Sequence, residues 1–130
     1  MGVRFGTLST KVAQNALPAN ATETVIYIVG PMILATDSVA VLFHWFITLV
    51  VGTGTTVIAV RMRRGTTTAG GLIGASNWSQ TVAAGQTICM AGVYFDVFFA
   101  SVTSYCLTVT QTGASGAGTV QDGTLAAFIL

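Results

Sequence analysis

The stretch "TVIAVRMRRG", from Thr56 to Gly65, decides between two opposite fold classes for this chain. It ends a run of 23 uncharged residues that begins at Ser38, so charge arrives abruptly, as it does at the positive flank of a membrane span. Within the stretch, however, apolar and basic positions alternate. The apolar positions are Ile58, Val60 and Met62, and the arginines of the opposite parity are Arg61 and Arg63. A period of two predicts a β-strand with one buried face.

The uncharged segment before this stretch has the same period. Its odd positions from Val39 to Val51 are all apolar, whereas its even positions are mixed. The run Gly52-Thr53-Gly54 fits a turn better than the end of a membrane helix. His44 would also place an ionisable group at membrane depth, which is costly. We therefore expect two strands of a soluble sheet here, and no membrane partner.

Charge is scarce in the chain as a whole. The 130 residues suit one domain, of which 7% are charged and 52% hydrophobic, with a net charge of +1. An ordinary soluble domain has about 25% charged residues. A monomer with so few charges would be poorly soluble, so we expect much of its surface to be buried against copies or partners. The small net charge also provides no field that would recruit nucleic acid.

The composition favours an all-β fold. The chain holds 20 threonines and 15 glycines, and its apolar runs are short and separated by Gly, Thr and Ser turns. We predict an antiparallel two-sheet sandwich of the jelly-roll type, with about eight or nine strands, as a single domain over residues 23–130. Residues 1–22 have no sustained period, so we expect an extended N-terminal arm that orders against a neighbouring subunit. The same segment lacks the apolar core of a secretory leader.

Reactive side chains are few. His44 is the one histidine, and no metal-ligand or phosphate-loop spacing occurs, so we expect no catalytic residue, no cofactor and no metal. The protein is therefore predicted not to be an enzyme; an enzyme would need His44 as its base. Cys89 and Cys106 could pair or stay reduced.

Candidate contact residues lie in three segments. We expect the cluster Arg61, Arg63 and Arg64 at a sheet rim or a subunit contact, because three arginines without a wider basic face are weak evidence for nucleic acid. In "VYFDVFF", residues 93–99, the odd positions are uniformly apolar and are predicted to face the core.

Asp96 then faces outward, where it would pair with Arg61 or Arg63, within one chain or between subunits. Apolar side chains on the outer faces, namely Phe46, Tyr94 and Phe98, would be buried against neighbouring subunits.

Three stretches carry a resemblance to a known family. These are "TTVIAVRMRRGTTTAG" (55–70), "VAAGQT" (82–87) and "YCLTVTQTGASGAGTV" (105–120), followed by an apolar terminal strand. Over residues 24–130 the chain resembles the small jelly-roll structural proteins of bacteriophage virions, including capsid decoration (cement) proteins and head or tail appendages. Similar strands occur in trimeric domains of the tumour-necrosis-factor and complement-like type. The resemblance implies a homotrimer in the virion with no catalytic residues to carry over, and partners that are the major capsid protein or other virion proteins.

These observations favour a capsid decoration protein that stabilises a phage head by self-association. A capsid-shell or tail component is the nearest alternative. A trimeric carbohydrate- or receptor-binding module is a further one; it would use loops around 77–80 or 112–118, although Trp45 and Trp78 are expected to be packing residues.

Overall fold

The computed structural model describes residues 5–8, 10–11, 16–19, 21–32, 40–97, 104–113 and 116–130. All of the regular secondary structure in these ranges is β-structure. The strands are β1 (Phe5–Leu8), β2 (Thr10–Lys11), β3 (Ala16–Leu17), β4 (Thr24–Val29), β5 (Ala40–Val50), β6 (Thr56–Arg64), β7 (Leu72–Val82), β8 (Thr87–Val97), β9 (Tyr105–Thr112) and β10 (Gly118–Ile129).

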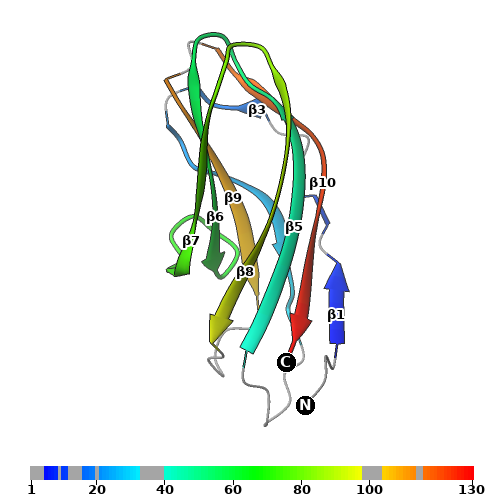
Figure 1. The fold of residues 1–130 in the computed structure, drawn as a ribbon. Coiled ribbons are helices and arrows are strands. Elements are labelled where there is room, and N and C mark those ends of the chain that lie inside the picture. Colours follow the sequence, from blue (N-terminus) through cyan, green and yellow to red (C-terminus); the bar gives the residue numbers. More distant parts are fainter. Residues whose placement is uncertain are drawn as a thin grey trace.

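The strands form two antiparallel sheets that face each other (Figure 1). Sheet A has the order β1-β10-β5-β8, with β3 also paired to β10, and sheet B has the order β2-β4-β9-β6-β7. Without the two-residue strands β2 and β3, eight strands remain in the arrangement of two interleaved four-stranded sheets that defines a jelly roll. The predicted all-β, two-sheet, jelly-roll-like sandwich is confirmed.

The core lies between the sheets, and in β5 and β6 it is made by the alternating positions that the sequence indicated. Every odd residue of β5 from Val41 to Leu49 is fully buried, and so are Ile58, Val60 and Met62 of β6. Trp45 lies at the centre, with its ring 6.2 Å from that of Trp78 in an edge-to-face arrangement. Burial of one parity on β5 and β6 directs the inner faces of the two sheets toward each other.

The segment that imitated a membrane span forms β5, a turn and the beginning of β6. The buried backbone N–H of Gly52, in the turn, donates to Oε1 of Gln111 at 2.8 Å. The described ranges contain no helix long and apolar enough to cross a membrane.

Two short connections lie on either side of β7. Residues 65–71 link β6 to β7, and residues 83–86 link β7 to β8 across the edge of the sandwich. Gly65 and Gly85 have φ angles of 91° and 68°, which lie in the left-handed region that glycine adopts without steric cost.

The described parts of the N-terminal segment pair within the same chain. Strand β1 pairs with β10, β2 with β4, and β3 with β10, all antiparallel. Strands β1 and β2 are edge strands of their sheets, so each pairs on one side only within the chain. That the segment orders against a neighbouring subunit stays a prediction. Strands of two to four residues are too short to show a period, which is why the sequence did not reveal them. The domain boundary at residue 22 stays a prediction.

Candidate functional site

The arginines at the end of β6 are the first candidate site, and the structure gives each of them a partner. Arg63 makes two hydrogen bonds to the carboxylate of Glu23, from Nε to Oε1 and from Nη2 to Oε2, both at 2.8 Å. Arg61 donates from Nε to Oδ1 of Asn77 at 3.1 Å. Both side chains lie on the outward face of β6, as the alternation predicted.

The Arg63–Glu23 pair also recruits β9. The hydroxyl of Thr108 donates to Oε1 of Glu23, so the carboxylate of this residue, which directly precedes β4, links β6 and β9 across the outer face of sheet B. Burial raises the pKa of Glu23, but the hydrogen bonds from Arg63 and Thr108 outweigh that effect and lower the pKa below its usual value. Arg63, Glu23 and Thr108 therefore form a partly buried ion-pair cluster, and the guanidinium group of Arg63 is not free to bind an external anion.

Asp96 pairs with Arg64, and not with Arg61 or Arg63 as predicted. Arg64 donates from Nε to Oδ2 at 3.0 Å and from Nη2 to Oδ1 at 2.7 Å. The hydroxyl of Tyr105 donates to Oδ2 of Asp96 at 3.0 Å. The prediction was wrong because Arg61 and Arg63 point outward from sheet B, whereas Arg64 has the inward parity and reaches the carboxylate between the sheets.

The faces of β8 are the reverse of those predicted. Asp96 is 3% exposed and points inward, while Val93, Phe95 and Val97 are 56%, 52% and 61% exposed. Both parities of this strand are rich in large apolar side chains, so apolarity alone did not distinguish them. The polar groups on the inner parity all find partners, which removes the cost of burying them. The available signal was Arg64, whose inward parity at the end of β6 favours an acidic partner between the sheets.

Tyr94 is likewise an inward residue and not the predicted outer contact. Its hydroxyl donates to the backbone carbonyl of Val60 at 2.7 Å and accepts from the backbone N–H of Trp78 at 3.1 Å. The ring lies 5.6 Å from that of Trp45. Burial raises the pKa of Tyr94 to about 12. Tyr94 thus links sheet A to both strands of the β6–β7 hairpin.

Phe46 lies on the outward parity of β5, as predicted, and is half-buried there. Its role at an interface stays a prediction. Phe98 lies outside the described residues.

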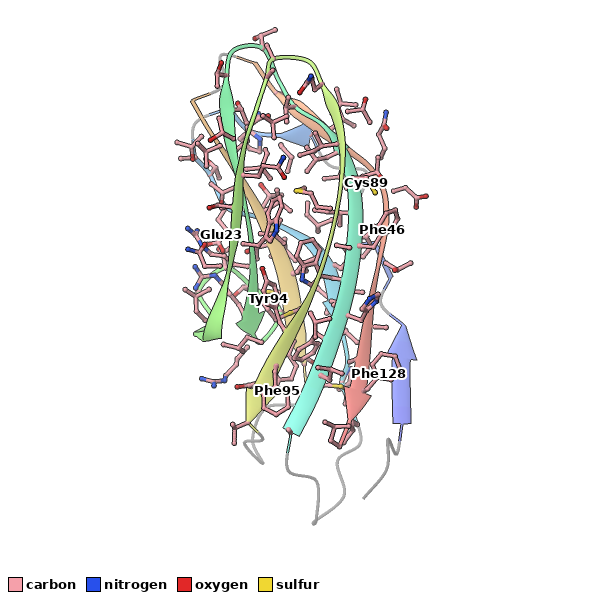
Figure 2. All side chains as sticks on the ribbon, in the orientation of Figure 1. Glu23, Phe46, Cys89, Tyr94, Phe95 and Phe128 are labelled. Carbon is pink, nitrogen blue, oxygen red and sulfur yellow. The ribbon has the colours of Figure 1, made fainter. Side chains whose placement is uncertain are left out.

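The outer face of sheet A forms a second candidate site, which we define as the outward side chains of β8, β5 and β10. Cross-strand pairing arranges these side chains in rows: Phe95, Leu42 and Phe128; then Val93, His44 and Ala126; then Ala91, Phe46 and Thr124. Figure 2 shows Phe46, Cys89 and Phe128 on the opposite side of the sandwich from Glu23. Its described ionisable groups are His44 in the middle row, and Asp122 and Cys89 nearer the Gly85 turn. This face is mainly apolar.

The outer face of sheet B has the opposite character. The cross-strand pairs of β6 and β7 there are Val57 with Thr81, Ala59 with Ser79, and Arg61 with Asn77. Beside them lies the Arg63–Glu23 ion pair, with side-chain exposures of 17% and 16%. One sheet of the sandwich therefore presents polar and charged groups, and the other presents apolar ones.

The remaining reactive groups are dispersed in the described part of the chain. His44 is exposed on sheet A, and no three His, Cys, Asp or Glu side chains of the described residues gather in a metal-binding group. Cys89 and Cys106 are separate thiols. Cys89 is exposed, whereas burial raises the pKa of Cys106 to about 11.

The segment 77–80, which we considered as a binding loop, lies inside strand β7. The ring of Trp78 packs against the core beside Trp45, which confirms that both tryptophans are packing residues. Trp78 therefore offers no open platform for a sugar.

Comparisons with known proteins identify the fold. No family model and no curated protein matches the sequence. Among solved structures, the chain is similar to one from the Gx strain of infectious bursal disease virus, with a TM-score of 0.56 and 12% identity over 98% of this chain and 34% of that one. It is similar to a chain of the T13 particle of the same virus, with a TM-score of 0.58 and 13% identity over 96% of this chain and 30% of that one. It thus spans about a third of those chains.

A third similar structure is the vertex protein P5 of PRD1, with a TM-score of 0.52 and 12% identity over 100% of this chain and 99% of that one. The expected resemblance to jelly-roll proteins of virions is confirmed at the level of the fold, because the chain shares this jelly roll with proteins of viral particles.

Proposed function

We propose that this chain is a structural protein of a virion that works by self-association, as a decoration protein on the capsid of a phage. The observation that carries the proposal is the fold: the whole jelly roll superposes on a viral vertex protein and on part of the chains of a viral particle. The match to a vertex protein over nearly all of both chains supports an accessory position on the capsid.

The surface of the molecule supports the same proposal. The chain has 7% charged residues, and the described arginines of β6 and their acidic or amide partners meet within the chain. The remaining charge provides little electrostatic repulsion between separate copies of the chain. Exposed apolar side chains on one sheet are what an obligate contact would cover. The expected assembly is a homotrimer that binds the major capsid protein.

Two measurements test this function. Multi-angle light scattering without detergent should give a mass of about three times that of the 13.4 kDa chain. Immunogold electron microscopy of virus particles from the source culture, with an antibody raised against the purified chain, should label the head surface. Labelling confined to tails would favour the tail component instead, and particles without label would contradict a virion role.

A further inference from the structure

We infer that the outer face of sheet A is the surface through which copies of this chain bind one another. This inference rests on the proposed self-association and specifies where it occurs. In a trimer, three such faces would meet around the symmetry axis.

The exposed apolar side chains concentrate on this face. Val93, Phe95 and Val97 protrude from β8 with more than half of their surface exposed. Leu42, Phe46 and Phe128 continue the apolar surface across β5 and β10. A contiguous apolar patch of this kind marks an interaction site on a soluble protein.

The distribution of charge on the molecule indicates which surface of a second copy covers the outer face of sheet A. The rows around Leu42 and Phe46 carry no carboxylate, ammonium or guanidinium group in the described strands, so a charged partner surface would lose hydration without gaining an ion pair. The outer face of sheet B, with Arg61, Arg63 and Glu23, is such a charged surface. The surface of a second copy that matches these rows is the same set of rows on its own sheet A.

The size of the face also suits a contact between copies. Strands β5 and β8 have 11 residues each. Eleven residues extend about 36 Å and three neighbouring strands about 14 Å, which gives on the order of 500 Å² in projection. The accessible area of a face covered with side chains exceeds its projection. It is therefore of the same order as the area of about 800 Å² that each partner buries in a stable interface.

A pair of matched variants of the full chain tests the inference. Val93→Lys places a charge on the outer face of sheet A, and Val57→Lys places the same charge at a valine that is 42% exposed on the outer face of sheet B. Sedimentation equilibrium should show association weakened at least about tenfold by Val93→Lys, because the ammonium would be desolvated without a partner. Val57→Lys should leave the association unchanged. Circular dichroism checks that both variants are folded.

The outcomes separate this inference from the proposed function. If the unmodified chain is an oligomer and Val93→Lys is an equally stable oligomer, the face is wrong while self-association stands. If Val57→Lys dissociates the oligomer and Val93→Lys does not, the contact lies on sheet B and the inference is overturned. If the unmodified chain stays monomeric at every concentration, both proposals fail.

Thiol labelling of the unmodified chain gives an answer even if Val93→Lys does not fold. Cys89 lies on the same outward parity of β8 as Ala91 and Val93, and the buried Cys106 reports unfolding. Maleimide should label Cys89 at least about tenfold more slowly in the isolated oligomer than in the dissociated chain, because a buried interface excludes the reagent. Equal labelling rates would place Cys89 in solvent and overturn the inference.

Discussion

Arg64 and Asp96 form a two-pronged ion pair that ties the end of β6 in sheet B to β8 in sheet A, with N–O distances of 2.7 and 3.0 Å. The carboxylate is 3% exposed and the arginine side chain 31% exposed. Because Tyr105 donates to the same carboxylate, three strands meet at one buried acid. The pair links the two sheets at the end of the sandwich opposite the Gly85 turn.

Loss of this pair should destabilise the fold. Arg64→Ala removes the cation from a buried carboxylate and should lower the free energy of unfolding by about 3 kcal/mol, measured by urea denaturation. The control is Arg61→Ala, whose hydrogen bond to Asn77 is exposed and should contribute less than about 0.5 kcal/mol. Equal losses in the two variants would contradict a structural role for the Arg64–Asp96 pair.

Gly92 should not tolerate a side chain. A Cβ atom there would lie 2.6 Å from Cζ2 of the buried Trp45. Gly92→Ala should therefore cost about 1–3 kcal/mol through overpacking of the core, measured as a lower thermal midpoint. Gly71→Ala is the control, because the nearest atom to its Cβ would be 4.0 Å away. An unchanged midpoint for Gly92→Ala would show that Trp45 can move aside.

Tyr94 should make the protein sensitive to alkaline pH. Its pKa is raised to about 12 by burial, so the folded state holds the phenol proton more tightly than the unfolded chain does. The resulting stability is complete below a pH of about 10, the pKa of an unperturbed tyrosine, and is lost as pH rises toward 12. Tyr94→Phe should flatten the decrease in urea midpoint between pH 9 and pH 11.

At neutral pH the same variant should lose about 1–2 kcal/mol, because the carbonyl of Val60 and the N–H of Trp78 lose their shared partner. A decrease above pH 10 that is identical in the variant and the unmodified chain would assign the effect to another group.

The stability of the fold should depend on the side-chain amide of Gln111. It is fully buried, accepts from the N–H of Gly52, and donates to the carbonyls of Gly116 and Leu17 at 3.0 and 3.4 Å. Gln111→Glu would place a carboxylate against two carbonyl oxygens and should cost about 3 kcal/mol at pH 7. The loss should be smaller at pH 4, where a protonated carboxyl group can donate again. Gln80→Glu, at an exposed position of β7, should change stability little at either pH.

Several features of the fold could be predicted because they depend on local pattern. The alternation in residues 41–51 and 58–62 showed which side of each strand is buried, and the glycine-rich connections showed where the strands end. Where the pattern was ambiguous, the prediction failed. In β8 both parities are apolar, so the assignment of Val93, Phe95 and Val97 depended on which inner residues could find polar partners.

The sequence by itself determined the class of this protein: a β-sandwich with few charges and arginines on one face of a strand, because strand periodicity and composition act over a few residues. Only the tertiary structure decided that Arg64 meets Asp96, that Tyr94 joins the two sheets, and that one outer face is apolar and the other charged. These depend on pairs as distant along the chain as Glu23 and Thr108. Such contacts are decided by strand register, where a shift of one residue exchanges the buried and exposed faces.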